Sequence, residues 1–486
     1  MKIMKIKLEN HIFFGNCEFD FTDGNGKIFD NIIVAGENGS GKTQLLNLIY
    51  DFSSLVMDAP VRQEKRFFYL SCTESDFLVI KSLFDKDGEL SYPGELLIIK
   101  DFSKPSYSWQ RYSVYYHYDN KQSQNATKKF NSNEFFENDQ IKQQLGAIFS
   151  TVEINYNPNI ISNRTAKEID EKFQKCLKSG DDLATEIQQL LIDIETNDAI
   201  DVSDWVKNNP GTVVPENIQQ KRMKRFTKAF SAIFSNLNFN GAYSVDGKIK
   251  VLFEKLGKKI DISELSSGEK QIVFRGSFLL QNQQSTKGCL VLIDEPEISM
   301  HPLWQTKIFD YYRNLFIDDN GQTSQIFMAT HSQYVLGSAL NKQDVLILAL
   351  KNTSGGVRID KITAPFVLPI PTSAELNYFI FNIISIDYHI QLYGYLQNLI
   401  KNNKGWKFCS VKKCDDYILS HSCYDARIHE KKQQSQYNGN STEYNTLPTY
   451  LRNLIDHPEL NYGIDEEELA ISIKLLIDIC RNYYNN

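Results

Sequence analysis

The pattern of apolar and polar positions differs from one segment of this chain to the next. Short runs such as CEFDF (17–21) and NIIVA (31–35) have the composition of strands, and the second is a continuous apolar run that ends at a glycine, as a buried strand does. Between 268 and 350 the pattern alternates between helix and strand, which is the order that a parallel sheet requires. Residues 165–236 interleave acidic and basic positions and predict a short helical insert. The stretch 119–144 is rich in Asn, Gln and Lys and predicts a solvated excursion.

A change of pattern late in the chain predicts two domains. The segment PFVLPIPT (365–372) contains three prolines and has the composition of a linker. We therefore expect one domain over 1–365 and a second over 366–486. In the second domain, 373–400 predicts one long helix, followed by an irregular polar insert to about Asn445. The predicted fold class is α/β with a mixed sheet and a short helical insert, followed by an all-α C-terminal bundle.

Composition narrows the class of protein. The chain has 486 residues, of which 42% are hydrophobic and 23% charged, so long disorder is excluded. The net charge of -7 means that any nucleic-acid binding must come from a local patch. We expect no membrane span, because no apolar run reaches about 18 residues, and MKIMKIKLEN lacks the apolar core of a secretory signal. Eight irregularly spaced cysteines predict reduced thiols and a cytoplasmic location.

The segment GENGSGKT, from Gly36 to Thr43, matches the pattern G-x4-G-K-[ST] between a predicted strand and a predicted helix. A glycine-rich loop turns consecutive N–H groups toward one point, and the helix N-terminus adds its dipole, so the two together bind a phosphate chain. We expect Lys42 to reach the β- and γ-phosphates of ATP and the Thr43 hydroxyl to hold Mg²⁺. The predicted nucleotide-binding residues of this loop are Gly36, Asn38, Gly39, Ser40, Gly41, Lys42 and Thr43.

Two carboxylates follow the apolar run 290–293 in CLVLIDEPE. Asp294 and Glu295 would emerge at the carboxyl end of a buried parallel strand, where open α/β sheets place their ligands. Adjacent side chains on a strand point to opposite sides, which favours two roles rather than one. We expect Asp294 to bind Mg²⁺ and Glu295 to position the attacking water.

Two further motifs carry a family resemblance. The run from Leu265 to Lys270 (LSSGEK) precedes a helical pattern, and ATHS, which contains His331, follows the strand SQIFM. With the two motifs above, this order resembles ABC-type, SMC-like P-loop ATPases. The resemblance implies that Ser266 and Gly268 contact the γ-phosphate held by a second copy, hence a homodimer or a larger even-numbered assembly. It also implies that His331 is the switch histidine.

Two departures from that family pattern matter. No clear Q-loop glutamine stands out, and Glu153 and Asn155 are only the nearest candidates. The predicted insert is too short for a long coiled-coil arm. In these two features the chain is more similar to the compact ATPases of bacterial antiphage defence, such as the Septu, PARIS and retron-associated ATPases, than to chromosome-condensing proteins.

Near the end of the chain, Arg452 and Asn453 are followed by His457 in R-N-x3-H. This spacing resembles the R-x4–6-H motif of HEPN domains, which implies a metal-independent ribonuclease. His457 would move the proton of an RNA 2′-hydroxyl, and Arg452 would stabilise charge on the phosphate. Anticodon nucleases of the PrrC and RloC type join such a domain to an ABC-type ATPase, so tRNA is a candidate substrate. Alternatively, Arg452 and His457 have no catalytic role, and they lie near a helix C-terminus because the helix dipole favours such side chains there.

Sulfur and imidazole side chains gather in the predicted polar insert, namely Cys409, Cys414, His421, Cys423 and His429. A zinc site needs four ligands with close paired spacing. The spacings C-x4-C and H-x-C match no common zinc pattern, so we expect free cysteines in a loop.

These motifs lead to one functional prediction and two alternatives. The prediction is an antiphage defence protein whose dimeric ATPase heads gate a C-terminal HEPN-like ribonuclease. The first alternative is a non-nucleolytic ATPase sensor or scaffold that regulates a separate nuclease or toxin partner, with an effector or a nucleic-acid trigger encoded nearby. The second is an ABC ATPase of the DNA-repair type, which the missing long arms disfavour.

Overall fold

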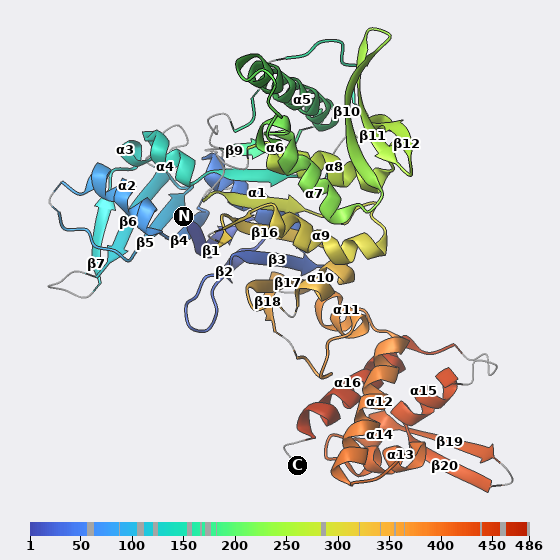
Figure 1. Ribbon diagram of the computed structural model, residues 1–486. Coiled ribbons are helices and arrows are strands. Elements are labelled where there is room, and N and C mark those ends of the chain that lie inside the picture. Colours follow the sequence, from blue (N-terminus) through green and yellow to red (C-terminus); the bar gives the residue numbers. More distant parts are fainter. Residues whose placement is uncertain are drawn as a thin grey trace. The chain divides into compact units, whose positions relative to one another are not determined.

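The chain divides into two compact units, Met1–Ile362 and Thr363–Asn486 (Figure 1). The structure is a computed structural model, and each unit is described by itself. The residues described are 1–55, 63–86, 88–104, 111–119, 125–152, 158–165, 168–170, 176–180, 182–282, 288–319, 321–340, 342–353, 356–363, 365–437, 440–456 and 463–483. Within these ranges no helix is long and apolar enough to cross a membrane.

A seven-stranded sheet forms the centre of the larger unit. Its strands, in spatial order, are β18 (Gly356–Ile362), β17 (Val345–Thr353), β3 (Asn31–Gly36), β16 (Gln325–Thr330), β13 (Leu290–Asp294), β8 (Ala147–Ser150) and β9 (Cys176–Lys178). All neighbours run parallel except β18, which is antiparallel to β17. Every residue of β3, β8, β13 and β16 is buried, which explains why these strands are almost continuous apolar runs.

A six-stranded antiparallel sheet accompanies it. Its strands, in spatial order, are β2 (Gly15–Asp20), β1 (Lys2–His11), β4 (Lys65–Ser71), β5 (Gly94–Asp101), β6 (Tyr112–Tyr118) and β7 (Ala126–Phe130). Helix α1 (Lys42–Ser54) contributes Leu45, Ile49 and Phe52 to a core cluster drawn from both sheets. Phe52 stacks on Phe68 of β4 with ring centroids 3.9 Å apart. This packing anchors α1, which begins at the end of the P-loop, the GENGSGKT segment over 36–43.

The prediction of a solvated excursion over 119–144 is wrong for residues 125–144, while residues 120–124 lie outside the described residues. After β7, this stretch forms α3 (Ser132–Glu137) and α4 (Asp139–Gln144). Its apolar side chains Phe130, Phe135, Phe136 and Ile141 all enter the shared core. Polar composition is misleading here because a few large aromatic groups bury enough area to hold a short helix pair. Nearby, α2 (Glu74–Phe84) packs against α4.

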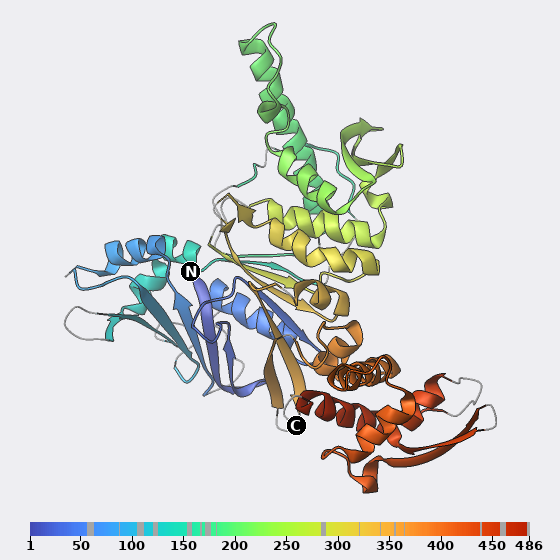
Figure 2. The same cartoon turned by 60° about the horizontal axis from the view of Figure 1, so that its bottom comes forward.

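Among the described residues, the first helix of the predicted insert begins at Leu183 rather than at 165. Its helices are α5 (Leu183–Asn208), α6 (Glu216–Gln219) and α7 (Met223–Ile233). Upstream of them, β9 pairs with β8 at the edge of the large sheet. Figure 2 shows the far end of α5 running away from the two sheets. A separate three-stranded sheet of β10 (Leu237–Val245), β11 (Lys248–Lys255) and β12 (Lys258–Asp261) follows.

Three helices connect the remaining strands of the larger unit, and they are α8 (Ser267–Leu280), α9 (Pro302–Asn314) and α10 (Gln333–Ala339). A short turn, η2 (Ile262–Glu264), leads into α8, and the two-residue strands β14 (Ile317–Asp318) and β15 (Gly321–Gln322) pair with each other. Each of the three helices has an N-cap side chain that accepts a hydrogen bond from a backbone N–H of the first turn. These N-cap residues are Ser266, His301 and Ser332. The alternation of helix and strand predicted for 268–350 is confirmed.

The smaller unit is mainly helical. Its helices are α11 (Ser373–Phe381), α12 (Ile386–Asn403), α13 (Val411–Ser420), α14 (Ala426–His429), α15 (Leu447–Asp456) and α16 (Glu466–Asn482). The expected single helix over 373–400 is interrupted at Asn382, which has a φ of 57° and ends α11. Asn tolerates this left-handed conformation better than most residues. Ser385 then caps α12.

The predicted irregular polar insert is also more ordered than expected. It holds α13, α14 and a hairpin of β19 (Glu430–Tyr437) and β20 (Asn440–Thr446), so this helical unit is not purely α. Cys414 lies in α13 and is fully buried, rather than in a loop.

The proline-rich segment behaves less like a free linker than its composition suggests. Leu368 is buried in the core of the smaller unit. The backbone N–H groups of Val367 and Leu368 donate to Oε1 of Glu375 at 3.1 and 3.0 Å. One buried carboxylate therefore ties the segment to the start of α11.

Candidate nucleotide-binding site

The P-loop follows β3 and depends on three glycines in left-handed or strained backbone conformations. Gly36, Gly39 and Gly41 have φ values of 152°, 75° and 98°. A Cβ at Gly36 would lie 2.3 Å from the carbonyl oxygen of Leu350, and one at Gly41 would lie 2.5 Å from the Phe13 ring. Only glycine fits this close approach, so the loop can curl its N–H groups inward.

Lys42 occupies the inside of that loop. Its side chain donates from Nζ to the carbonyl oxygens of Gly36 and Glu37, both at 2.9 Å, and the residue is 4% exposed. Burial lowers the pKa of Lys42 to about 8, although the nearby carboxylates of Glu295 and Asp294 act in the opposite direction. The ammonium group is thus held by neutral carbonyls beside the place where a phosphate would bind.

The residues predicted to hold Mg²⁺ lie together. The Thr43 hydroxyl donates to Oδ2 of Asp294 at 2.9 Å. Asp294 is 2% exposed, and its Oδ1 is buried with no hydrogen-bond partner among the described residues. Burial raises the pKa of Asp294, and the Thr43 hydrogen bond opposes that shift. A buried carboxylate oxygen without a partner is costly, so this pair of oxygen ligands fits a hard divalent cation.

Glu295 and His331 form a pair at the ends of adjacent strands. His331 Nε2 lies 3.1 Å from Glu295 Oε1. Glu295 has a φ of 43°, which turns the chain out of β13, and its N–H donates to the carbonyl oxygen of Ala329 at 2.9 Å. Burial, aided by the charge of Lys42, lowers the pKa of His331, so the imidazole is neutral near pH 7. A neutral imidazole can share a hydrogen bond with this carboxylate.

The predicted signature residues lie beside a different segment. Ser266 caps α8 by accepting from the N–H of Glu269, and its hydroxyl donates to the Glu269 carboxylate at 2.8 Å. Lys255 pairs with Glu269 at 2.7 Å. A Cβ at Gly268 would lie 2.8 Å from the carbonyl oxygen of Ser299, just after β13. The structure thus brings together the P-loop, Asp294, Glu295 and His331. Ser266 instead contacts Glu269 on its own helix, and Gly268 lies against Ser299.

The sequence analysis assigns no role to two buried charged residues at this site. Arg275 of α8 is fully buried and donates to Ser150 Oγ at 2.8 Å, to the Glu295 carbonyl oxygen at 3.1 Å and to the Asp294 carbonyl oxygen. Its charge, like the Thr43 hydrogen bond, opposes the rise in the pKa of Asp294 that burial causes. The second is Glu297, which accepts hydrogen bonds from the segment that carries His331. The sequence does carry a signal for Arg275, because it is a lone arginine within the apolar run QIVFRGSFLL.

The Arg–His motif of the smaller unit is only partly visible. Arg452 lies on α15 and pairs with Asp456 at 2.6 Å, one turn further along the same helix. It also donates to the Asn453 side chain at 3.1 Å. His457 lies outside the described residues, as do the Q-loop candidates Glu153 and Asn155. The predicted pairing of Arg452 with His457 therefore stays a prediction.

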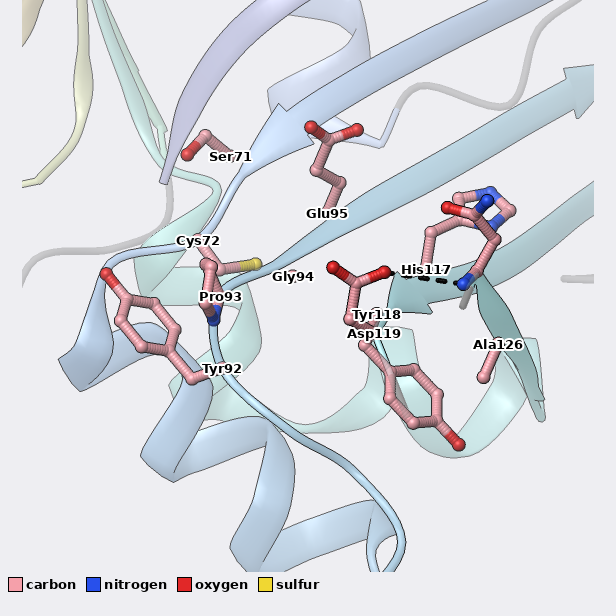
Figure 3. Close-up of a pocket in the computed structure, with 11 residues that line it drawn as sticks. Ser71, Cys72, Tyr92, Pro93, Gly94, Glu95, His117, Tyr118, Asp119 and Ala126 are labelled. Atoms are coloured by element: carbon pink, nitrogen blue, oxygen red, sulfur yellow. Dashed lines mark hydrogen bonds between the residues drawn. The ribbon is translucent and has the colours of Figure 1, made fainter. Parts of the chain in front are cut away.

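A separate pocket of about 470 Å³ lies on the antiparallel sheet (Figure 3). Cys72, Glu95, His117 and Asp119 contribute to its lining, together with residues of β4 to β7. Burial raises the pKa of the Cys72 thiol to about 12, so this thiol is not a nucleophile near neutral pH. The backbone N–H of Asn125 donates to Oδ1 of Asp119 at 3.3 Å. This pocket is formed apart from the nucleotide motifs.

The chain belongs to the AAA ATPase domain family, which matches residues 1–336. This membership confirms the predicted P-loop ATPase head, and the α/β fold with a helical C-terminal region is confirmed as well. No curated protein matches the chain.

Several solved structures are similar to the chain at low identity. The SMC head bound to the C-terminal winged-helix domain of ScpA has 13% identity and a TM-score of 0.42, covering 74% of this chain and 98% of that chain. The SMC head domain from Thermotoga maritima has 12% identity and a TM-score of 0.36, covering 75% and 100%. An SMC head with an extended coiled coil, bound to the C-terminal domain of ScpA derived from Pyrococcus furiosus, has 12% identity and a TM-score of 0.35, covering 74% and 96%.

Proposed function

We propose that the larger unit binds Mg²⁺-ATP and hydrolyses it. The observation that carries the proposal is the convergence of Lys42, the Thr43–Asp294 pair and the Glu295–His331 pair at the carboxyl ends of β3, β13 and β16. These groups come from three distant parts of the sequence, and a parallel sheet places ligands at this edge. The roles of cation, metal ligand and proton acceptor that ATP hydrolysis requires are all represented.

Each residue has a distinct task in this proposal. The N–H groups of the P-loop and Lys42 bind the phosphates, and Thr43 and Asp294 hold Mg²⁺, which when bound neutralises phosphate charge. Oε1 of Glu295 orients a water and accepts its proton. His331, neutral and hydrogen-bonded to the same oxygen, fixes the Glu295 carboxylate.

A dimer would complete this site. We propose that Ser266 and Gly268 act on a nucleotide held by a second copy of the chain, in a homodimer or a larger even-numbered assembly. In support, Gly268 packs against Ser299, and the Ser266 hydroxyl is engaged with Glu269 rather than with the P-loop. A helix N-terminus such as that of α8 suits an incoming phosphate.

For the smaller unit, a ribonuclease that cleaves RNA through Arg452 and His457, with tRNA as a candidate substrate, remains our first proposal. A docking platform for a separate nuclease or toxin is the second, and one observation favours it. Arg452 is already neutralised by Asp456, and Asn453 is engaged with Gln433 at 3.1 Å. An antiphage role belongs to either version and rests on the family resemblance alone.

A metal test separates the ATPase proposal from simple nucleotide binding. Asp294→Asn removes the charge that would hold Mg²⁺ but keeps an oxygen for the Thr43 hydroxyl. We expect purified wild-type protein to release phosphate from ATP only with Mg²⁺. The variant should lose at least about 100-fold in turnover, the scale of a lost charge-stabilising group. Metal-independent turnover, or an unaffected Asp294→Asn variant, would contradict the proposal.

A further inference from the structure

A buried carboxylate two residues beyond Glu295 holds the backbone of the segment that carries His331. Oε1 of Glu297 accepts three hydrogen bonds, from the Thr330 hydroxyl at 2.7 Å, from the His331 N–H at 2.7 Å and from the Ser332 N–H at 3.1 Å. Glu297 is 8% exposed. Three donors from consecutive residues therefore converge on a single oxygen.

The second oxygen of Glu297 makes this arrangement costly. Oε2 is buried and has no hydrogen-bond partner among the described residues. Burial also raises the pKa of Glu297, since the carboxylate loses its water shell. An uncompensated buried oxygen lowers stability, yet an apolar side chain in its place would leave the donors of Thr330, His331 and Ser332 without this acceptor. The presence of a carboxylate here points to a task other than filling the core.

The geometry shows what that task is. The backbone N–H of His331 is held by Glu297, while its imidazole contacts Oε1 of Glu295 at 3.1 Å. Glu295 and Glu297 are separated only by Pro296, whose ring fixes φ, and the Glu295 carbonyl oxygen is held by Arg275 at 3.1 Å. The two members of the Glu295–His331 pair are therefore tied to each other through a short and stiff piece of chain.

The segment 330–332, which carries His331, is also held through Ser332. The Ser332 hydroxyl donates to Oε1 of Gln305 on α9 at 2.6 Å and also accepts from the N–H groups of Tyr334 and Val335. These contacts fix the start of α10. Glu297, in contrast, holds the segment from Thr330, where β16 ends, through His331 to the N–H of Ser332.

We propose that Glu297 is a positioning residue for ATP hydrolysis, which sets the distance between His331 and Glu295 by fixing the backbone at residues 330–332. This inference rests on the proposed ATPase function. It assigns Glu297 no contact with the phosphates or with Mg²⁺. It therefore predicts an effect on the chemical step and little effect on nucleotide binding.

Two substitutions at one position separate positioning from packing. Glu297→Gln keeps an acceptor oxygen for the backbone N–H groups of His331 and Ser332, whereas Glu297→Leu removes the acceptor at similar volume. We expect Glu297→Leu to lower kcat about 10–100-fold with a Kd for ATP within about threefold of the wild type, because a small misplacement of reacting groups slows chemistry. Glu297→Gln should retain kcat within about threefold.

Glu375 provides a matched control. It too is buried, accepts backbone N–H groups on one oxygen and leaves the other without a partner among the described residues, but it lies in the smaller unit. Glu375→Leu should lower the denaturation midpoint without changing ATP turnover per folded molecule. Hydrogen exchange gives a readout apart from activity: the amides of His331 and Ser332 should exchange at least about tenfold faster in Glu297→Leu and at the wild-type rate in Glu297→Gln.

The outcomes are distinguishable. A kcat for Glu297→Leu within about threefold of the wild type, equal losses in both Glu297 variants, or unchanged exchange at His331 would overturn the positioning role. Loss of ATP binding in parallel with turnover would also overturn it, since the residue would then be merely structural. A wild-type chain that does not hydrolyse ATP, with exchange altered as described, would instead remove the proposed function.

Discussion

Charged side chains are held in two contrasting ways in the two units. In the larger unit, Lys42, Asp294 and Glu297 are between 2% and 8% exposed and belong to segments brought together by the sheet. On α15 of the smaller unit, the Arg452 side chain is 28% exposed and pairs with Asp456 along the same helix. A buried charge requires several elements to hold it, whereas an i,i+4 pair near the surface contributes about 0.5 kcal/mol or less. Geometry therefore argues for function in the first region much more strongly than in the second.

The largest expected effect concerns the smaller unit, and it would show function in the region for which geometry argues less strongly. If the smaller unit is a metal-independent ribonuclease, His457→Ala should reduce RNA cleavage about 10²–10⁴-fold, the range for a lost general acid–base group. The products should carry 2′,3′-cyclic phosphates, and cleavage should persist in EDTA once the heads hold nucleotide, because the nucleophile is the 2′-hydroxyl. End-group analysis of cleaved total RNA measures this.

Arg452→Ala should behave like His457→Ala in that assay. A suitable control is Arg427→Ala, which removes an exposed arginine paired with Asp425 in the same unit. Equal activity of all three variants, or products with 5′-phosphate ends, would favour the docking platform for a separate nuclease.

Removing the P-loop cation should produce the next largest effect. Lys42→Ala deletes a buried ammonium that is positioned to make charge-assisted hydrogen bonds to phosphate. The loss should be about 2–4 kcal/mol, or roughly 30–1,000-fold in the Kd for ATP. Isothermal titration with ATP measures it. Lys221→Ala, at an exposed lysine paired with Asp201, should bind like the wild type, and a similar Kd for Lys42→Ala would show that the loop does not bind phosphate.

The pH dependence of ATP binding should sharpen the contrast between a buried and an exposed cation. The pKa of Lys42 is lowered to about 8, so in the free protein its charge is present below that pH and lost above it. A bound phosphate favours the charged form. ATP binding should therefore take up a proton above about pH 8, and the Kd should rise by up to about tenfold per pH unit there. Lys42→Arg should flatten this dependence, and a flat wild-type profile between pH 7 and 9.5 would contradict it.

Subunit mixing has the smallest expected signal. If Ser266 serves the nucleotide of the other copy, Ser266→Arg and Lys42→Ala proteins should each be inactive alone. Mixed, they should recover roughly a quarter of wild-type turnover, because half of the dimers are mixed and each of those retains one of its two sites. Full ATPase activity in a protein that light scattering shows to be monomeric would rule out this arrangement.

Sequence reasoning can group the candidate residues of the nucleotide site because their motifs lie at the ends of buried strands. A short apolar run such as LVLID is typical of a central strand, and the parallel register brings Asp294 beside Ala329 and Thr330 beside Ala35. The same logic finds Lys42. It cannot find Glu297 or Arg275, since their importance lies in contacts with backbone groups far away in the sequence.

The smaller unit was harder to predict for physical reasons. The hairpin β19–β20 runs through EKKQQSQY and NSTEYNT, which lack the alternation of apolar and polar residues that marks a strand. The break at Asn382 lies within a run, NYFIFNIIS, that is apolar enough for a continuous helix. There the competing conformations differ little in local propensity, and packing decides between them.

The most direct test of the ATPase account is a single-turnover comparison of the wild type with Glu295→Gln. The amide keeps the shape of the side chain and a hydrogen-bond partner for His331 but cannot accept a proton from water. We expect the variant to bind ATP with a Kd near that of the wild type and to hydrolyse the bound nucleotide about 10²–10⁴-fold more slowly, so that intact ATP stays trapped on the protein. Hydrolysis at the wild-type rate, or loss of ATP binding equal to that of Lys42→Ala, would contradict the roles assigned to this site.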